Sequence, residues 1–227
     1  LMPHIRTGHR IASATQEDGG GWLLTGEHEG LPFSERFDFL VVCSGTFSEP
    51  FIPQTEGMGD FVDGGGRLLH TSQVASPDLY RGKNVVVVGF GKSACDVASA
   101  IAAEARETYL VFRQAKWKVP KRILGTNYKY LILSRFGEAI TKFRYRNRAE
   151  NLIHALGLPP MIFRRMQRIF TKQQGLKACN LVPAASLSDL LFGELSVESD
   201  GFFQQVREGK ITALPGEIRS YHRGGML

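Results

Sequence analysis

The sequence has few cysteines, no long apolar run and no signal-peptide start, and each absence excludes a class of protein. Its three cysteines, Cys43, Cys95 and Cys179, form no CxxC pair and no Cys/His metal spacing. That distribution argues against a disulfide framework and against a structural metal. No apolar stretch approaches the roughly 20 residues that a membrane-spanning helix needs. We therefore expect a metal-free cytoplasmic protein.

Catalytic side-chain patterns are also lacking. There is no Ser-His-Asp arrangement and no pair of carboxylates at catalytic spacing, and the six histidines are scattered. The composition is that of an ordinary globular protein, with 227 residues of which 43% are hydrophobic and 22% charged, enough for one large domain or two small ones. We therefore name no catalytic side chain.

Positive charge is concentrated in one part of the chain. Between residues 113 and 172, fifteen Lys and Arg residues stand against two Glu residues, while the whole chain has a net charge of +6. Such a block could bind nucleic acid, an anionic membrane surface, a partner protein or cofactor phosphates. No nucleic-acid motif accompanies it, so we predict no nucleic-acid partner and favour basic helix faces that flank a nucleotide pocket.

One stretch combines a strand pattern, a glycine turn and a helix start. Residues 84–88 read Asn-Val-Val-Val-Val, which is typical of a strand buried on both faces of a parallel sheet. Gly89 and Gly91 permit a tight turn and a close backbone approach, and apolar residues then recur at helical spacing. Because a helix N-terminus binds anions, we predict a pyrophosphate site formed by Gly89, Gly91, Lys92, Ser93 and Ala94. A glycine turn without a ligand is the alternative.

The next strand, residues 108–112, ends at Arg113. An NAD site carries an acid at this place, whereas an NADP site tends to carry an arginine for the 2′-phosphate. Arg113 supported by Lys116, with Lys118 as a further candidate, therefore favours NADP(H). The alternative is an arginine that only faces solvent.

Turn residues divide the rest of the chain into segments. We expect strands at residues 10–15, 22–27 and 37–43, the last losing its alternation to become fully apolar and entering a central sheet, and a Pro/Gly-rich linker over residues 50–66. Further expected elements are a loop and short helix over 183–193, a helix over 202–208, and strands over 210–214 and 217–222. Basic amphipathic helices are expected within about 123–180, with core-facing stripes of Ile132, Phe136, Ile140 and Phe143, then Ile162, Phe163, Met166, Ile169 and Phe170. A membrane-lying orientation of these helices is the less favoured alternative.

Both ends of the chain look cut, and residues 223–227 resemble a hairpin turn without its second strand, so we expect a fragment.

Four motifs in order resemble those of the class B flavoprotein monooxygenases, the group of flavin-containing and Baeyer–Villiger monooxygenases. Residues 38–46 with the following prolines resemble the linker motif, residues 66–72 the end of the fingerprint, and residues 82–98 the NADP-binding motif. Arg113, Trp117 and Pro120 match the run after the next strand. The likeness covers most of residues 35–122 and, more loosely, 181–221. The sequence departs from the family pattern in three ways. Phe61, the aromatic of the fingerprint, comes three residues too early, and Val74 stands where an aromatic is expected. The first FAD motif is absent.

The resemblance implies an α/β fold with a Rossmann-like NADP-binding domain, a central parallel sheet and a basic helical segment. Residues 1–50 would be the β-meander and strand of an incomplete FAD-binding domain. Residues 51–227 would be the NAD(P)-binding domain with a helical insertion at about 123–180. The implied cofactors are FAD and NADP(H), with Ser44, Gly45 and Thr46 near the flavin. His70 would couple the two domains. The alternative is a histidine whose hydrogen bonds are satisfied within the strand-to-loop connection that contains it.

The implied function is NADPH- and FAD-dependent oxygenation of a small organic substrate by O₂ through a C4a-(hydro)peroxyflavin. The piece itself is expected to bind NADPH weakly or not at all, to retain no stoichiometric FAD and to be inactive. Two alternatives stay open, a non-enzymatic NADPH-binding module and another two-dinucleotide flavoprotein oxidoreductase, which the missing CxxC disfavours. The sequence indicates neither the substrate, nor the oligomeric state, nor the choice between heteroatom oxygenation and Baeyer–Villiger chemistry.

Overall fold

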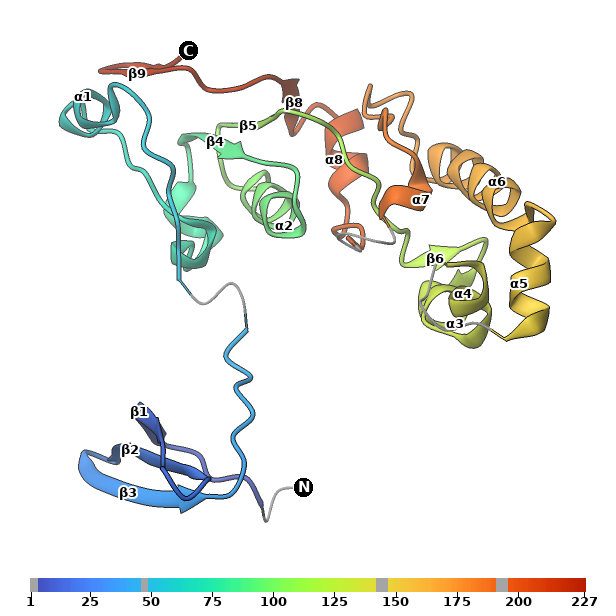
Figure 1. Cartoon of the computed structure of the whole chain (residues 1–227). Coiled ribbons are helices and arrows are strands. Elements are labelled where there is room, and N and C mark those ends of the chain that lie inside the picture. The colour runs from blue at the N-terminus through green and yellow to red at the C-terminus, as the bar shows by residue number, and fades with distance from the viewer. Residues whose placement is uncertain (1–3, 46–48, 142–146, 191–195) are drawn as a thin grey trace. The chain divides into compact units, whose positions relative to one another are not determined.

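A computed structural model of the chain describes residues 4–45, 49–141, 147–190 and 196–227 (Figure 1). The chain divides into two compact units, Leu1–Pro50 and Phe51–Leu227.

The first unit is a three-stranded antiparallel meander. Its strands are β1 (His9–Gln16), β2 (Trp22–His28) and β3 (Leu31–Phe37), in the order β1-β2-β3. The β2–β3 turn is tight because Glu29 and Gly30 both have positive φ, 51° and 82°, the geometry that two-residue hairpins require. The first two strands were predicted from alternation at nearly these bounds.

The third predicted strand is wrong. β3 ends at Phe37, and residues 38–43 lie outside any strand. Phe39, Val41 and Val42 are 89%, 80% and 74% exposed. In the β2–β3 register Trp22 pairs with Phe37, and β2 begins at Trp22. The apolar run therefore has no partner left on β2 and does not enter a sheet within the described residues.

The second unit is built on a parallel sheet in the order β4-β5-β8. The strands are β4 (Asn84–Val88), β5 (Glu107–Phe112) and β8 (Thr212–Pro215), and helix α2 (Lys92–Ile101) connects β4 to β5. Helix α8 (Phe202–Arg207) lies beside α2, and the core between helices and sheet includes Ala98, Leu110 and Phe202, all 0% exposed. This strand–helix–strand arrangement confirms the predicted Rossmann-like α/β fold with a parallel sheet.

The expected burial of β4 on both faces is wrong. β4 is an edge strand of the described sheet, and Val88 is 58% exposed. Of its residues only Val87 is buried. A run of valines reports a preference for strand geometry, while the position of a strand within a sheet depends on long-range pairing.

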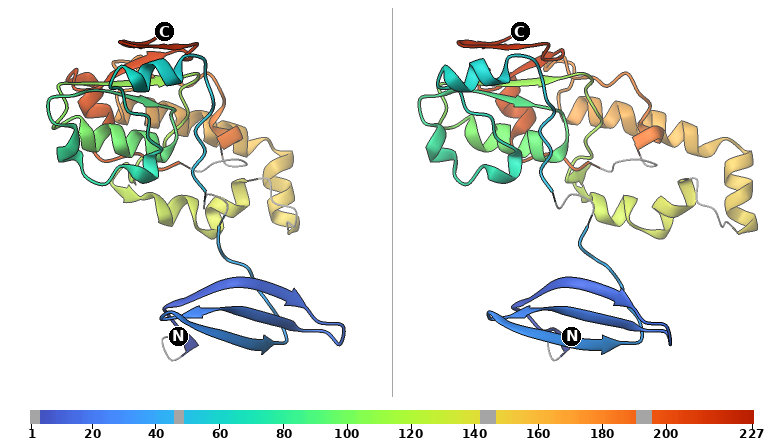
Figure 2. Two further views of the ribbon diagram at one scale, coloured as in Figure 1. Left: turned by 90° about the vertical axis from the view of Figure 1, so that its left-hand side faces the viewer. Right: turned by 60° about the vertical axis from the view of Figure 1, so that its left-hand side comes forward.

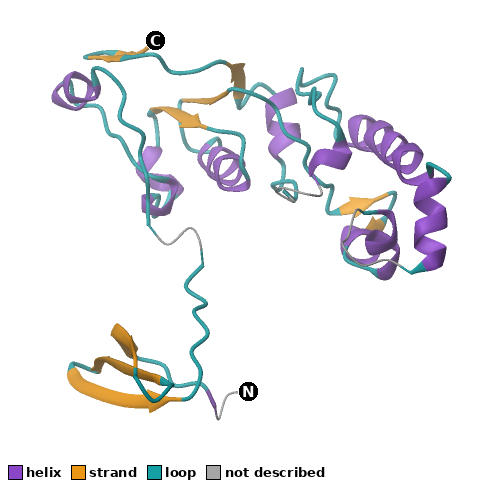
Figure 3. Cartoon of the chain, viewed as in Figure 1, coloured by secondary structure: helices purple, strands orange, loops and turns teal. Residues whose placement is uncertain are grey.

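A helical segment comes after β6 (Arg122–Ile123) and β7 (Thr126–Asn127) (Figure 3). It contains α3 (Tyr128–Ile132), α4 (Arg135–Ile140), α5 (Arg148–Ala155) and α6 (Leu158–Gln173), with the short α7 (Leu187–Leu190) later in the chain. The predicted stripes mostly face the core: Ile140, Phe163 and Phe170 are 5%, 5% and 0% exposed, whereas Phe136 is 53% exposed and that prediction is wrong. Phe143 lies outside the described residues. No helix in the described part is long and apolar enough to cross a membrane.

The expected linker and the expected open hairpin both need correction. Helix α1 (Met58–Asp63) lies inside the supposed linker and contacts β9 (Tyr221–His222), as Figure 2 shows. A Cβ on Gly57 would lie 1.9 Å from the Tyr221 carbonyl oxygen, so glycine is needed for this close approach. β9 pairs with β10 (Gly225–Met226), which means that the hairpin has its second strand. The predicted strands over 210–214 and 217–222 are shorter, as β8 and β9.

Two short 3₁₀ helices complete the second unit. These are η2 (Thr71–Gln73) and η3 (Pro77–Tyr80), which precede β4 in the chain. Both contact α2. They place His70, the residue before η2, in the same unit as the glycine turn.

Candidate dinucleotide-binding site

The glycine turn lies at the carboxyl end of β4. Gly89 has φ of +115°, a conformation that a residue with a Cβ rarely adopts. Its N–H donates to the Val111 carbonyl at 2.8 Å, which ties the turn to β5. A Cβ on Gly89 would meet the Ala94 methyl at 3.7 Å, and Ala94 is 6% exposed. Ala94 therefore packs beneath the turn as the small residue that the motif predicted.

Gly91 is different because the chain itself does not require a glycine there. Its φ of −70° and ψ of 176° suit any residue, and a Cβ would meet no heavy atom within 4 Å. It is the N-cap of α2 and makes no side-chain capping bond. The first N–H groups of a helix lack intrahelical acceptors and carry a partial positive charge. Open space above an uncapped helix start is the geometry that an anion needs.

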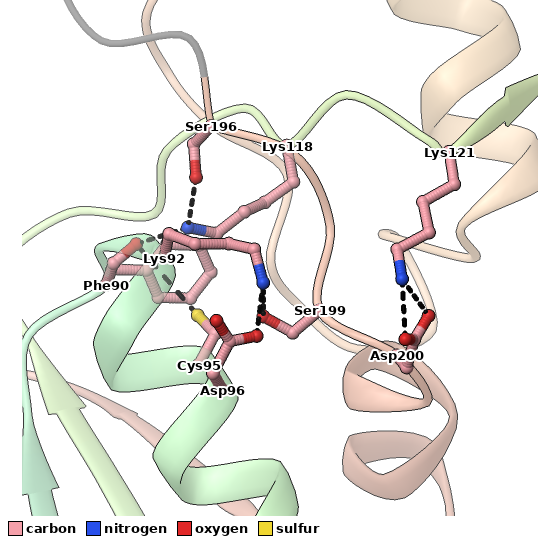
Figure 4. Close-up of polar contacts among 9 residues, drawn as sticks. All are labelled: Phe90, Lys92, Cys95, Asp96, Lys118, Lys121, Ser196, Ser199 and Asp200. Carbon is pink, nitrogen blue, oxygen red and sulfur yellow. Dashed lines mark hydrogen bonds and ion pairs between the residues drawn. The ribbon is translucent and has the colours of Figure 1, made fainter. Parts of the chain in front are cut away.

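The charged side chains near the start of α2 are engaged with each other. Lys92 pairs with Asp96, and its Nζ lies 3.5 Å from the Ser199 Oγ (Figure 4). Burial would raise the pKa of Asp96, but hydrogen bonds from Lys92 and Ser199 hold it below its usual value. Lys92 and Ser93 are exposed. Both thus remain accessible to a ligand at the helix start.

Arg113 lies at the same edge of the sheet as the turn. β4 and β5 are parallel, with Val88 opposite Val111, so the residues after each strand emerge at one edge. The Arg113 side chain is 81% exposed, and its Nε lies 3.6 Å from a carboxylate oxygen of Glu217. Lys116, three residues further on, is exposed. The structure therefore brings together the glycine turn and Arg113, as predicted, and adds Glu217, which the sequence did not suggest.

A cavity of about 180 Å³ opens beside Arg113. It extends over the ends of β5 and β8 and includes Asn180, a non-glycine residue with φ of +53°. Its lining is mixed in polarity, formed by Phe112, Arg113, Gln114, Ala115, Asn180, Val182, Ala184, Ala185 and Pro215. In open α/β sheets, ligands bind beyond the carboxyl ends of the strands, and this cavity lies at that edge.

Lys118 does not belong with Arg113 and Lys116, contrary to the expectation from sequence. It is 1% exposed, and its Nζ donates to the Phe90 carbonyl at 2.6 Å and to the Ser196 Oγ at 3.0 Å. Burial lowers the pKa of Lys118 below its usual value. Its neighbour Trp117 is also buried and donates from Nε1 to the Ala185 carbonyl at 2.7 Å. Lys118 thus lies beneath the turn and cannot reach a surface phosphate.

His70 has a local structural role in the second unit. Its Nδ1 accepts from the Ser72 backbone N–H at 3.3 Å, and its own N–H donates to the Gln73 Oε1 at 2.8 Å. These two bonds form a capping box on η2, a role that the His-Thr-Ser-Gln spacing could have suggested.

Phe61, the aromatic that comes three residues too early in the fingerprint, nevertheless packs on its glycine. A Cβ on Gly66 would lie 2.3 Å from the Phe61 ring, so Phe61 of α1 covers Gly66.

The residues expected near the flavin lie in the first unit. Ser44 and Gly45 are exposed, and Gly45 has φ of +79°, while Thr46 lies outside the described residues. In the described residues no group of His, Cys, Asp or Glu could hold a metal ion.

Comparison with known proteins places this geometry in a family. The model of the family described as flavin-binding monooxygenase-like matches residues 9–172. The chain is 33% identical over 122 residues to human flavin-containing monooxygenase 3, covering 52% of this chain and 22% of that protein. It is 32% identical over 122 residues to the 4-hydroxybenzoate brominase (decarboxylating) of Marinomonas mediterranea, covering 53% and 23%.

Similarity to a solved structure extends over the whole chain. A steroid monooxygenase bound to NADP superposes with a TM-score of 0.63 at 17% identity, over 100% of this chain and 50% of that one. The chain thus spans less than a quarter of the two curated relatives and half of this structure. The fold, the glycine turn and the family match over residues 9–172 agree, and the chain belongs to the flavin-binding monooxygenase-like family.

Proposed function

We propose that this chain is the NADP(H)-binding part of an NADPH- and FAD-dependent monooxygenase. Residues 51–227 would form the NAD(P)-binding domain, and residues 1–50 part of the FAD-binding domain. The observation that carries the proposal is Gly91, where open space meets the uncapped start of α2 at the end of a parallel strand. The chain does not need a glycine at this position for its own folding, whereas a bound pyrophosphate would.

The residues present fit a dinucleotide phosphate. Backbone N–H groups of Gly91, Lys92, Ser93 and Ala94 would hold the pyrophosphate. Gly89, whose own N–H is bonded to Val111, would let the backbone approach it closely. Arg113 would bind the 2′-phosphate with help from Lys116, since a guanidinium matches the geometry of a phosphate. The cavity beside Arg113 would take the adenosine end. Because Glu217 already pairs with Arg113, its carboxylate would have to give way to the phosphate.

The flavin side of the proposal rests on family membership. Ser44, Gly45 and Thr46 would border the flavin, and His70 would couple the flavin and nicotinamide domains, with its capping bonds fixing the ring. When bound, NADPH supplies a hydride to FAD and the reduced flavin activates O₂ for transfer to a small organic substrate. This chain's own residues bind and orient the nicotinamide cofactor. The cytoplasmic location stays a prediction from cysteine usage.

The test is a titration of the chain with NADPH and, separately, with NADH, measured by nicotinamide fluorescence, together with an absorbance scan for flavin. We expect a preference for NADPH of at least tenfold, which is about 1.4 kcal/mol, and no stoichiometric FAD. No NADPH-dependent oxygen uptake is expected from this piece. Equal affinity for NADH would remove the role of Arg113, and binding of neither would refute the dinucleotide site.

A further inference from the structure

The buried lysine beneath the glycine turn has no part in the phosphate contacts proposed above. Lys118 is 1% exposed. Its Nζ makes the two hydrogen bonds to Phe90 and Ser196 and lies 5.1 Å from the centre of the Phe90 ring (Figure 4). Burying an ammonium group is costly even when it is hydrogen-bonded. A methionine of similar length would fill the same space without that cost, so the charge at this position calls for an explanation other than packing.

The geometry of one peptide group links Lys118 to the helix start. The Phe90 carbonyl and the Gly91 N–H belong to the same peptide, which is trans. In a trans peptide the C=O and the N–H point in opposite directions. Because Lys118 holds the carbonyl oxygen at 2.6 Å, the Gly91 N–H is directed away from Lys118. That N–H belongs to the residue above which the space is open.

The turn needs such a restraint because glycines flank Phe90 on both sides. Glycine restricts its own backbone dihedrals less than any other residue. The Phe90 ring is fixed in the core by Phe112 and Phe202, at centroid distances of 4.7 and 5.9 Å. Lys118 fixes the other end of the residue, its carbonyl. Ring and carbonyl together determine how the turn presents its backbone.

We propose that Lys118 is a positioning residue for the dinucleotide site, holding the Phe90–Gly91 peptide so that the Gly91 N–H faces a diphosphate. Its positive charge also lies on the protein side of the anion, where the low dielectric makes it effective. This inference rests on the proposed NADP(H) site and adds to it a residue that does not touch the ligand.

Four other titratable groups face or neighbour Lys118 and bear on its charge. Cys95, Asp96 and Lys92 come from α2, and Lys116 from its own segment. Burial lowers the pKa of Lys118, an effect that the Cys95 thiol partly opposes. The NADPH affinity of the wild-type chain should therefore fall as the pH rises through this lowered pKa. A Cys95→Ala variant, which also removes the 4.0 Å contact of the thiol with the Phe90 carbonyl, separates this titration from that of the thiol.

The test compares Lys118→Met with Lys121→Met. Lys121 lies three residues further along the same segment, is 48% exposed and pairs with Asp200 at the surface, so its loss removes the same charge without touching the turn. NADPH affinity is measured by nicotinamide fluorescence from about pH 7 upward, with circular dichroism confirming the fold. Lys118→Met should weaken NADPH on the order of tenfold or more at about pH 7, the effect of losing a charged hydrogen bond, and should lose the pH dependence. Lys121→Met should keep both.

The outcomes separate this inference from the function on which it rests. If the wild-type chain binds no NADPH, the proposed site fails and Lys118 loses its role with it. If the wild-type chain binds NADPH and Lys118→Met binds it equally well, only the role of Lys118 is overturned. Should Lys118→Met fail to fold, the pH profiles of the wild-type and Cys95→Ala chains decide, since affinity independent of pH in both would overturn the inference.

Discussion

Replacing Gly91 by alanine should abolish most cofactor binding while leaving the fold intact. The added methyl group meets no protein atom within 4 Å, and φ of −70° is allowed for alanine. Alanine is a poorer N-cap than glycine by a few tenths to about 1 kcal/mol, and the less flexible unfolded chain offsets about 0.4–1 kcal/mol of that. The free energy of unfolding should therefore change by less than about 1 kcal/mol.

The cost to binding is larger because the methyl group occupies the space of the pyrophosphate. Loss of one charge-assisted hydrogen bond to a backbone N–H costs about 1.5–3 kcal/mol, or roughly ten- to 150-fold in the dissociation constant for NADPH. Nicotinamide fluorescence gives that constant, and thermal unfolding monitored by circular dichroism gives the stability.

Two glycine variants serve as controls for Gly91→Ala. Gly59→Ala in α1 also places its methyl group in open space. It should leave NADPH binding unchanged and raise the free energy of unfolding by up to about 1 kcal/mol. Gly89→Ala should lose stability as well as binding, because alanine at φ of +115° is strained by about 1–3 kcal/mol. If a folded Gly91→Ala chain binds NADPH as tightly as the wild type, the pyrophosphate does not lie on this turn.

Charged groups give four further predictions. Arg113→Ala should weaken NADPH binding roughly tenfold or more and NADH binding less than about threefold. Glu217→Ala, which frees the Arg113 guanidinium, should instead strengthen NADPH binding by up to about fivefold. Fluorescence titrations measure both effects, and equal losses of NADPH and NADH affinity in Arg113→Ala would contradict the assignment of Arg113. The free energy of unfolding of the wild-type chain, relative to that of Lys118→Met, should rise with pH. The unfolded chain keeps the lysine proton up to its ordinary pKa of 10.5, whereas burial makes the folded chain release it at a lower pH. Urea unfolding at several pH values measures this difference, and a difference that stays constant would refute the prediction. Glu150→Ala should lower the free energy of unfolding by about 1–3 kcal/mol, because the 6%-exposed Glu150 pairs with Arg135 and closes the capping box of α5. The control is Glu138→Ala, since Glu138 is a surface partner of the same arginine. Unchanged urea unfolding of Glu150→Ala would contradict the prediction.

Local signals in the sequence predicted the centre of the second unit well. The strand, the glycine turn and the helix over residues 84–101 coincide with β4 and α2, because β-branched residues, glycines and helical periodicity all act over a few residues. Arg113 was placed at the correct edge of the sheet for a similar reason, since β4 and β5 are parallel neighbours joined by a single helix. These residues also carry the candidate site, which is why so much of it could be predicted.

Errors arose where the outcome depends on residues far apart in the chain. The apolar run at residues 39–43 has the composition of a buried strand, yet β2 begins opposite Phe37 and offers the run no partner. Lys118 was named as a further candidate beside Arg113 and Lys116 for binding the phosphate, a role that needs an exposed side chain, as lysines usually are. Lys118 is buried because its neighbour Val119 pairs with Val197. Ser196 and Phe90 then accept hydrogen bonds from its ammonium group. No local pattern in the sequence reports these contacts.

An NADP⁺ titration of the ¹⁵N-labelled chain, monitored through its backbone amide resonances, shows most directly whether the β4–α2 turn binds the dinucleotide. This measurement detects weak binding and reports which amides are involved. We predict that the largest shifts occur in residues 89–94, with the Gly91 amide prominent, and at Arg113. Shifts confined to other parts of the chain, or none at saturating NADP⁺, would show that the β4–α2 turn is not the dinucleotide site.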